Sequence, residues 1–359
     1  MKVLVGMSGG VDSSVAAYLL KQAGHEVIGA TMSIWEKGRV FHGSSTADAC
    51  FSPHEEQDIE AASAVCERLE IPYYTLDCSD IYKKTVLENF KHEYLSGRTP
   101  NPCVWCNAKI KFKALPQAAR EHGLVFDKFA TGHYARVRFD EASERWQLLK
   151  GVDSKKDQSY FLYRLEQAQL EKILLPVGDK TKSEIRQIAR KVGLEVGDKP
   201  DSQDFYSGDI NDILQTAPKT GNFVTKDGKI LGTHQGIWNY TVGQRKGLGI
   251  AAEKPLYVLG FDVEKNNVIV GFEDENVRHT LTASNINWSG IAPIDEPRAF
   301  TAKIRSSQPA TPVLATPVSE SEIRIDFELT QRGIAPGQSV VLYDGDLVAG
   351  GGIIDAVRY

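Results

Sequence analysis

The fold of this chain is decided by the run Lys2-Val3-Leu4-Val5-Gly6-Met7-Ser8-Gly9-Gly10-Val11-Asp12-Ser13-Ser14. Its aliphatic start is typical of a buried parallel strand, and apolar residues recur at helical spacing from Val15 to Leu20 before Gly24 ends the helix. A small-residue loop between a strand and a helix N-terminus suits a phosphate, because glycines let backbone N–H groups approach and the helix dipole favours an anion. The run therefore predicts a phosphate-binding loop; the alternative is a tight turn without a ligand.

This loop belongs to neither of two common phosphate-binding classes. It lacks the lysine of a Walker motif, and it lacks the Gly-x-Gly-x-x-Gly spacing of a dinucleotide site. Ser8-Gly9-Gly10-Val11-Asp12-Ser13 instead resembles the pyrophosphate loop of ATP pyrophosphatases, which adenylate a substrate and release pyrophosphate. The resemblance implies ATP as the nucleotide.

Length and composition describe an ordinary globular protein of two or three domains. The chain has 359 residues, of which 42% are hydrophobic and 25% are charged. No apolar run reaches about 18 residues, and Met1 leads straight into the first strand, so we expect no membrane span and no signal peptide. We therefore expect a cytoplasmic protein, whose five cysteines are thiols, metal ligands or catalysts rather than disulfides.

The charge distribution bears on nucleic-acid binding. The formal net charge of −5 argues against indiscriminate binding, but it leaves room for a polynucleotide substrate because charge can be clustered. A single cluster of basic residues is more often a solvent-exposed surface than a binding site for the phosphates of a nucleic acid. The basic clusters of this chain are Lys109, Lys111 and Lys113; Lys155 and Lys156; Lys180, Lys182, Arg186, Arg190 and Lys191; and Arg245 and Lys246.

Strands and helices alternate through the first 200 residues. Further strands are expected at 26–31, 71–76 and 129–131, and helices at about 54–69, 82–95, 113–122 and 183–192. This alternation predicts an α/β fold with a doubly wound parallel sheet, in which ligands bind at the C-terminal ends of the strands. Thr131-Gly132-His133 and the phosphate loop both follow strands, so we expect the sheet to place them near one another.

The pattern changes near Gly197-Asp198-Lys199-Pro200. Beyond it, a helix is expected only at about 209–216, and short alternating strands are separated by turns such as Asp227-Gly228. We expect three domains: an ATP-binding catalytic domain at 1–200, a small mixed domain at 205–275, and a domain at 277–359 whose evenly spaced strands suit a small β-barrel.

A second motif, Arg98-Thr99-Pro100-Asn101-Pro102-Cys103-Val104-Trp105-Cys106-Asn107, contains a Cys-x-x-Cys pair. Its two prolines predict an extended backbone, so Cys103 and Cys106 are expected on a rigid loop rather than within a helix. Lys109 and Lys111 lie close in sequence, and a nearby cation lowers the pKa of a thiol. The pair alone suits half a zinc site, a redox pair or an iron–sulfur ligand set; the sequence holds no second Cys-x-x-Cys to complete a zinc site.

Together these motifs resemble the tRNA-specific 2-thiouridylase family, nearly end to end. The resemblance extends over Lys109-Ile110-Lys111-Phe112, Thr131-Gly132-His133-Tyr134, Asp157-Gln158-Ser159-Tyr160-Phe161-Leu162, Gly243-Gln244-Arg245-Lys246-Gly247-Leu248, Pro336-Gly337-Gln338-Ser339 and Gly350-Gly351-Gly352-Ile353-Ile354. It implies adenylation of the C2 oxygen of uridine 34 in a tRNA anticodon, followed by displacement of AMP by sulfur to give 2-thiouridine.

The resemblance also implies roles for single residues. ATP with Mg²⁺ would be bound by Gly6, Met7, Ser8, Gly9, Gly10, Val11, Asp12, Ser13, Met32 and Gly132, with Asp12 helping to hold the metal. A flipped-out uracil would be held by Asn101, Pro102 and Cys103. The tRNA would be contacted by His133, Asp157, Gln158, Ser159, Gln338 and, at a half-preserved motif, Arg305 and Ser306. Cys106 matches the family's nucleophile.

One position departs from the family. Many members carry a second catalytic cysteine about four residues after an Asp-Ser pair, and this cysteine bears a persulfide. Here the pair is Asp201-Ser202 and the matching residue is Tyr206, whose phenol cannot hold that sulfur. The two-cysteine relay therefore cannot be transferred to this chain in that form.

Two other cysteines, Cys103 and Cys50, can compensate. Cys103 stands where many members carry Asp, Cys50 lies in a loop after the second strand, and Cys66 and Cys78 are expected in the core. Together with Cys106, the residues Cys103 and Cys50 allow two versions of the sulfur-transfer chemistry. Three thiolates can hold a [4Fe–4S] cluster with one iron open to hydrosulfide; alternatively, a persulfide forms on Cys103 or Cys50 and Cys106 attacks it.

The implied partners are the tRNA anticodon stem-loop and a sulfur donor, which is a cysteine desulfurase, a sulfur-relay protein or inorganic sulfide. Two other functions stay open. A small-molecule adenylating ligase would share the phosphate loop but has no need of Asn101-Pro102-Cys103 or of a C-terminal barrel. A catalytically silent tRNA-binding paralogue is suggested by Tyr206, and the intact loop and Cys106 count against it.

Overall fold

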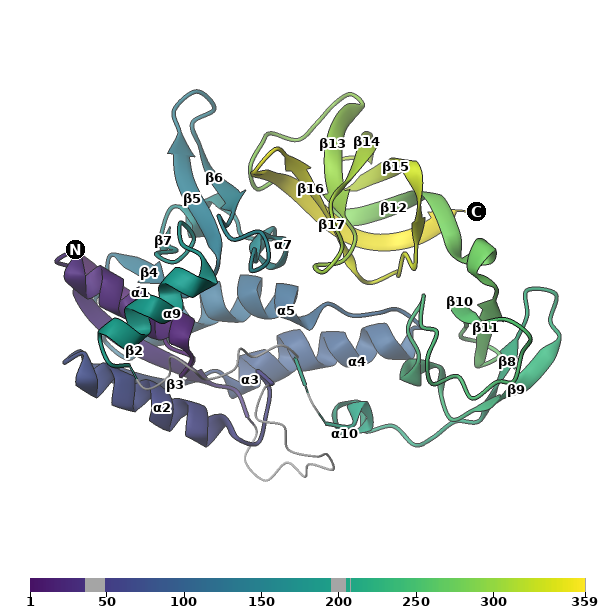
Figure 1. Cartoon of the computed structure of the whole chain (residues 1–359), viewed down its shortest axis with the longest axis horizontal. Helices are drawn as coiled ribbons and strands as arrows, with labels where there is room; N and C mark the ends of the chain where they lie inside the picture. Colours follow the sequence, from purple (N-terminus) through teal and green to yellow (C-terminus); the bar gives the residue numbers. More distant parts are fainter. Residues whose placement is uncertain (36–48, 195–204, 207, 359) are drawn as a thin grey trace.

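The N-terminal part of the chain is built on a parallel sheet (Figure 1). The computed structural model describes residues 1–35, 49–194, 205–206 and 208–358. Five strands follow the order β3-β2-β1-β4-β7, and each neighbouring pair is parallel. They are β1 (Lys2–Gly6), β2 (Glu26–Ser33), β3 (Tyr73–Asp77), β4 (Lys128–Ala130) and β7 (Ile173–Leu174). The expected sheet is confirmed.

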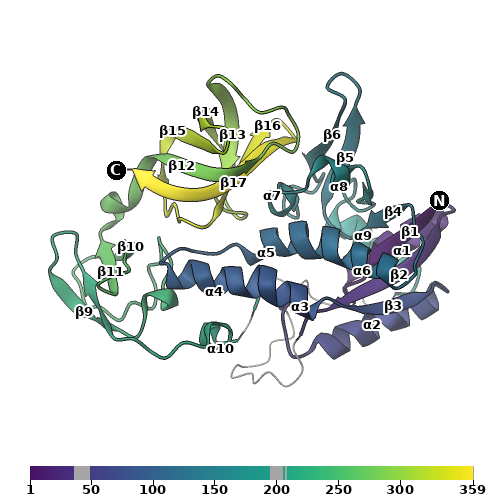
Figure 2. The same cartoon turned by 180° about the vertical axis from the view of Figure 1, so that it is seen from behind.

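Helices cover both faces of this sheet, as Figures 1 and 2 show from opposite sides. Val3 and Val5 of β1 belong to a core cluster shared with α1 (Val11–Gln22), α2 (Glu55–Arg68) and α9 (Lys182–Lys191). Leu4 points the other way, into a larger cluster, because side chains alternate along a strand. That second face carries α3 (Ser79–Tyr82), the π-helix η1 (Lys83–Leu87), α4 (Glu88–Leu95), α5 (Pro102–Trp105), the π-helix η2 (Cys106–Ala114) and α6 (Leu115–Glu121).

A hairpin interrupts the α/β pattern, and the sequence analysis did not foresee it. Strands β5 (Ala135–Asp140) and β6 (Arg145–Lys150) pair antiparallel, followed by the short helices α7 (Ser159–Leu162) and α8 (Gln167–Leu170). Leu149 of β6 pairs with Leu347, near the C-terminus. The hairpin therefore extends the C-terminal sheet and joins the first part of the chain to the last.

The remainder of the chain is β-rich. Helix α10 (Ile210–Leu214) precedes a four-stranded sheet in the order β10-β11-β8-β9, made of β8 (Gly221–Val224), β9 (Ile230–His234), β10 (Tyr257–Asp262) and β11 (Asn267–Gly271), with 3-10 turns η4 (Ile237–Asn239) and η5 (Glu273–Asn276). The last strands of the chain form a barrel, which is closed by the pairing of its first strand with its last. They are β12 (Val277–Asn287), β13 (Arg298–Lys303), β14 (Thr311–Ser319), β15 (Glu322–Arg332), β16 (Ser339–Asp344) and β17 (Leu347–Arg358). The expected C-terminal barrel is confirmed.

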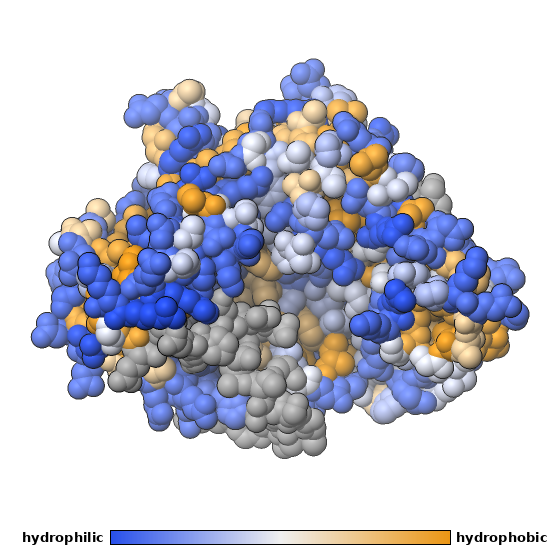
Figure 3. Space-filling model, in the orientation of Figure 1, coloured by the Kyte–Doolittle hydropathy of each residue, from blue (hydrophilic) through white to orange (hydrophobic). Residues whose placement is uncertain are grey.

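Figure 3 shows a largely hydrophilic face that is hollowed where these parts meet. Residues 197–202, which include the expected domain boundary and the Asp-Ser pair, lie outside the described residues, and the exact domain limits stay predictions. Within the described part of the chain, no helix combines the length and apolar character needed to cross a membrane.

Candidate nucleotide and thiol site

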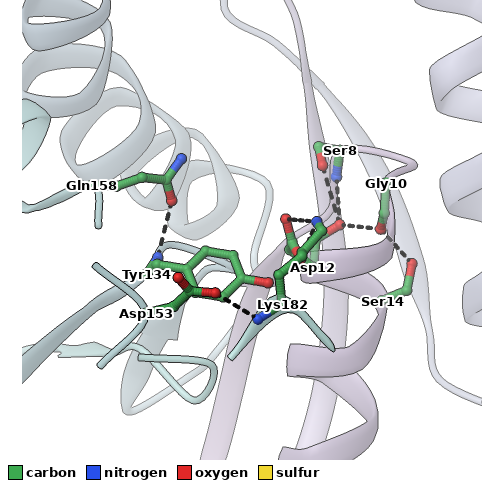
Figure 4. A network of polar contacts seen from close by, with 9 residues as sticks. Ser8, Gly10, Asp12, Ser14, Tyr134, Asp153, Gln158 and Lys182 are labelled. Carbon is green, nitrogen blue, oxygen red and sulfur yellow. Dashed lines mark hydrogen bonds and ion pairs between the residues drawn. The ribbon is translucent and has the colours of Figure 1, made fainter. Parts of the chain in front are cut away.

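The phosphate loop is shaped by its own hydroxyl groups (Figure 4). The N–H of Ser8 donates to Oγ of Ser13 at 3.2 Å, and Oγ of Ser14 donates to the carbonyl of Gly10 at 2.8 Å. Gly9 has a φ of +68°, and a Cβ added there would lie 2.6 Å from the carbonyl oxygen of Asp58. These contacts fold the loop tightly at the start of α1, where the first N–H groups have no acceptor within the helix and can bind an anion.

The turn after β4 lies against this loop, as expected. A Cβ on Gly132 would lie 2.6 Å from the backbone N of Ser13, so only glycine allows this approach. Next to it, Nδ1 of His133 is hydrogen-bonded to Oγ1 of Thr131 at 2.8 Å. Burial lowers the pKa of His133 to about 3, and Lys111 lowers it further, so the imidazole is neutral at physiological pH.

The end of β2 forms the next wall of the loop. Met7 donates its N–H to Ala30 at 2.8 Å, and Oγ1 of Thr31 donates to the carbonyl of Met7 at 2.8 Å, which places Met32 beside the loop. Glu55, at the start of α2, then accepts hydrogen bonds from Ser33, Ile34 and Trp35. Glu55 thereby fixes the segment around Met32, a role that no sequence motif indicated.

Asp12 is held by two residues that the sequence analysis did not assign to it (Figure 4). Nζ of Lys182 lies 2.8 Å from both carboxylate oxygens, and the hydroxyl of Tyr134 donates to Oδ1 at 2.7 Å. Tyr134 is held in turn by Gln158, whose Oε1 accepts its N–H at 2.9 Å. In the sequence, Lys182 is one member of a basic cluster. Its place in the first turn of a helix can be predicted from the sequence, but its pairing with Asp12, 170 residues away, cannot.

The two cysteines of the second motif lie in a helix, which corrects the expectation of a rigid loop. Pro102 begins α5, where a missing N–H costs nothing, and the π-helix η2 starts at Cys106. Cys103 is partly exposed and Cys106 is 8% exposed. π-Helical turns are rare and frequently occur at functional sites.

The approach to this helix is clamped by the C-terminal barrel. Nε2 of Gln338 donates to the carbonyl of Pro100 at 2.8 Å, and the N–H of Thr99 donates to the carbonyl of Pro336 at 2.7 Å. Asn101 is buried between these contacts and α5. The segments 98–102 and 335–339 therefore position the cysteines together.

Electrostatics link the thiols to the phosphate loop. Burial raises the pKa of Cys106 to about 11, although Lys111 lowers it, and Cys50 raises it further. The expected lowering of the thiol pKa by a nearby lysine is present, but burial outweighs it. Burial lowers the pKa of Lys111, but attraction to the thiolate forms of Cys106, Cys50 and Cys103 outweighs that effect and raises it. Lys111 also acts on His133, so one cation faces both the thiols and the turn beside Gly132.

Cys50 lies in a segment that is hydrogen-bonded to the segment of Tyr206, where the family's second cysteine is missing. It is exposed, and the N–H of its neighbour Phe51 donates to the carbonyl of Phe205 at 3.0 Å. This bond joins the Cys50 segment to that of Tyr206, whose hydroxyl donates to Asp212 at 2.9 Å. Cys66 and Cys78 are buried, as expected, at 0% and 3% exposure.

These positions bear on metal binding. Among residues 1–35, 49–194, 205–206 and 208–358, no group of three or more His, Cys, Asp or Glu side chains is arranged to hold a metal ion. The three thiols gather around Lys111 and Tyr82 without forming a cluster site in this arrangement.

Several residues expected to contact tRNA form hydrogen bonds within the protein. Oδ1 of Asp157 accepts the N–H groups of Gly151 and Ser159, and Ser159 is fully buried. Nη2 of Arg305 donates to the carbonyls of Val242 at 2.9 Å and Gly333 at 3.0 Å, while Ser306 is exposed. A direct contact to tRNA by these residues stays a prediction, and the Ser159 hydroxyl is not accessible for one here.

Comparisons with known proteins give three matching family models. Residues 1–206 match the tRNA methyl transferase HUP domain, residues 210–272 the tRNA methyl transferase PRC-barrel domain, and residues 278–354 the aminomethyltransferase beta-barrel domain.

Highly similar curated relatives share one name, tRNA-specific 2-thiouridylase MnmA. The protein of Endomicrobium trichonymphae is 48% identical over 356 residues, which cover 99% of each chain. That of Acetivibrio thermocellus is 46% identical over 364 residues, covering 98% of this chain and 99% of the relative. Among solved structures, a 4-thiouridine synthetase in complex with RNA and ATP matches 58% of this chain and 45% of its own, with 16% identity and a TM-score of 0.36.

Proposed function

This chain belongs to the tRNA-specific 2-thiouridylase family, and from that premise we propose that it is an ATP-dependent sulfurtransferase acting on uridine 34 of tRNA. It adenylates the C2 oxygen of the base and replaces that oxygen with sulfur, releasing pyrophosphate and AMP. The observation that carries the proposal is the position of Lys111. This single cation acts on the thiols of Cys106, Cys50 and Cys103 and also on His133, beside the phosphate loop.

The adenylation step uses the loop at the start of α1. Its N–H groups bind the phosphates of ATP, and the glycine at 132 allows the β4 turn to close over the loop. Asp12 offers two hard oxygen ligands beside this anion site, which suits Mg²⁺. A divalent cation there supplies charge neutralisation for the leaving pyrophosphate, while the fixed N–H dipoles are already oriented toward it.

The sulfur step uses the thiols on α5 and η2 together with Cys50. Cys50 is exposed, so a cysteine desulfurase or sulfur-relay protein can load it with a persulfide. The terminal sulfur then attacks C2 of the activated base, forming the C–S bond as the C–O bond to AMP breaks. Cys106 attacks the inner sulfur, which releases 2-thiouridine and leaves a Cys50–Cys106 disulfide for a thiol reductant to reopen.

The target base is held beside these thiols. We place the flipped uracil at Asn101, Pro102 and Cys103, on the helix start that Gln338 and Pro336 clamp. The anticodon stem-loop then approaches over His133 and Gln158. The [4Fe–4S] version requires Cys50, Cys103 and Cys106 to move into a common ligand set, so we favour the cluster-free persulfide.

Pyrophosphate release tests the nucleotide step. With tRNA and Mg²⁺·ATP present, the wild-type protein should release pyrophosphate, and Asp12→Ala and Ser8→Ala should each slow it on the order of 10²-fold without a matching loss of tRNA affinity. Release without tRNA would identify a small-molecule ligase, and no release under any condition would identify a silent paralogue. Near-normal release by both variants would refute the assignment of this loop to ATP.

Serine substitutions test the sulfur step. Cys50→Ser and Cys106→Ser should abolish thiolation, whereas Cys66→Ser and Cys78→Ser, at buried cysteines outside the relay, should retain it. Anaerobically purified protein should work without iron when a desulfurase supplies sulfur. Binding of about four irons, with loss of activity in Cys103→Ser as well, would support the cluster instead. Full activity of Cys50→Ser would remove Cys50 from the relay.

A further inference from the structure

Asn107 is a buried polar residue beside the thiols, and the proposed mechanism gives it no role. It follows Cys106 at the start of η2 and is 3% exposed. Its Nδ2 lies 3.4 Å from the carbonyl oxygen of Phe161 in α7. Its Oδ1 is shielded from solvent and has no hydrogen-bond partner within the described part of the chain. A buried acceptor without a donor destabilises a fold, so this oxygen is best explained by a ligand that brings the donor.

The neighbouring helix fixes the orientation of this amide. The carbonyl of Phe161 can only accept a hydrogen bond, so Asn107 must turn its amide nitrogen toward α7. Oδ1 is then held on the other side of the amide group, where it offers lone pairs and no proton. A ligand that pairs with it must therefore present an N–H or O–H group.

Asn107 lies between the thiols and the nucleotide site. Residues four apart share one side of a helix, so Cys103, Asn107 and Lys111 follow one another along a single face of α5 and η2. At one end of this face, Cys103 belongs to the segment where we place the flipped uracil. At the other end, Lys111 acts on His133, beside the phosphate loop. A base that receives sulfur from the thiols and AMP from the loop has to lie along this face.

We propose that Asn107 recognises the target base, with its Oδ1 accepting a hydrogen bond from the N3–H of uracil. This inference rests on the proposed function, because it takes uridine 34 as the substrate. The flipped base displaces the atoms that now cover the oxygen and supplies the missing donor. Cytosine carries a lone pair at N3 instead of a proton, so that lone pair would face those of Oδ1 and the hydrogen bond would be lost. Asn107 thereby selects uracil over cytosine.

Binding of anticodon stem-loops tests this role without turnover, with Mg²⁺ and an ATP analogue that cannot be cleaved between its α- and β-phosphates. Wild-type protein should bind a stem-loop with uridine 34 at least about tenfold more tightly than one with cytidine 34. Asn107→Leu has a similar size but no acceptor, and should bind both within about twofold of each other. Asn267→Leu removes another unpartnered buried oxygen, in the four-stranded sheet, and should keep the wild-type preference.

A purely structural role predicts a different result. If Asn107 only ties η2 to α7, Asn107→Leu should weaken the binding of both stem-loops equally and keep their ratio, which would overturn the inference. Asn107→Asp keeps an acceptor of the same size and should keep the preference for uridine; loss of the preference in this variant would also contradict the inference.

Wild-type protein gives a measurement that needs no folded variant. A stem-loop with 3-methyluridine 34 lacks the N3–H and should bind about as weakly as the cytidine stem-loop; binding as tight as that of uridine 34 would show that Oδ1 does not meet N3. Failure of the proposed function looks different. If wild-type protein binds neither stem-loop and tRNA triggers no pyrophosphate release, the uridine site itself falls. If it distinguishes the two stem-loops and Asn107→Leu distinguishes them equally well, only the role of Asn107 falls.

Discussion

The Cys106 thiol is subject to two opposing influences. Burial raises its pKa to about 11, and the ammonium of Lys111 acts in the other direction without overcoming it. The reactive thiolate is therefore a minor species at neutral pH in the free protein. This arrangement keeps Cys106 unreactive toward solvent oxidants at neutral pH.

A pH profile follows from these values. Because the thiolate fraction rises about tenfold per pH unit below the pKa, the single-turnover thiolation rate at saturating tRNA should climb steadily between pH 7 and 9. His133, with a pKa of about 3, should add no inflection near pH 6.5. Lys111→Met should slow the reaction, because it removes the group that lowers the thiol pKa; the exposed Lys113→Met is its control. A plateau reached by pH 7.5 would contradict the raised pKa.

Tyr206 is expected to be structural. Tyr206→Phe removes its hydrogen bond to Asp212, which should cost about 0.5–1.5 kcal/mol in the free energy of unfolding and leave thiolation nearly unchanged. Denaturant melts and nucleoside analysis measure the two effects. If the wild-type protein makes no 2-thiouridine with any sulfur source but Tyr206→Cys does, then Cys50 does not replace the missing cysteine.

At the scale of elements, the close contact between the β4 turn and α1 determines the shape of the nucleotide site. Gly132→Ala would push a methyl group against the backbone of Asp12 and Ser13, so ATP binding should weaken by at least an order of magnitude. Gly260→Ala is the matched control, since a Cβ there meets no atom within 4 Å. Calorimetric titration with ATP compares them. Unchanged affinity in Gly132→Ala would show that this contact does not shape the site.

The elements also show what could be predicted from sequence. The strand–loop–helix at residues 2–22 was readable, because glycine spacing and apolar periodicity are local signals. The helix beginning at Pro102 was not readable, because proline suits extended backbone and is equally well suited to a first helical position. The joining of the β5–β6 hairpin to β17 could not be predicted, because the two segments lie some 200 residues apart. The Asp12–Lys182 pair was not predicted for the same reason, because its two residues lie 170 positions apart in the sequence.

At the scale of the whole molecule, the C-terminal barrel connects the approach to the thiols with the other parts of the chain. The barrel segment 335–339 clamps the approach to α5, and the hairpin ties the barrel to the parallel sheet. Arg305 joins the barrel to the four-stranded sheet region through the carbonyl of Val242, and its second bond, to the carbonyl of Gly333, lies within the barrel. A substrate that spans these parts can contact all of them while its target base enters one site.

Loosening that connection should affect tRNA more than ATP. Arg305→Ala removes the hydrogen bond that joins the barrel to Val242 and a second one within the barrel, so the KM for tRNA should rise several-fold while metal-dependent ATP affinity stays within about twofold of wild type. Amide exchange around residues 240–250 should increase. Arg298→Ala breaks an exposed ion pair with Asp344 and serves as control. An equal loss of ATP affinity in Arg305→Ala would show that the contact supports the whole fold.

The central claim is that this chain couples ATP cleavage to sulfur transfer at one base. The most direct measurement is the stoichiometry of products from a tRNA transcript with uridine 34, Mg²⁺·ATP and a desulfurase with cysteine. The account predicts one pyrophosphate and one AMP for each 2-thiouridine, and none of the three from a transcript carrying cytidine 34. Pyrophosphate release that is independent of tRNA, or that is not matched by 2-thiouridine at position 34, would contradict it.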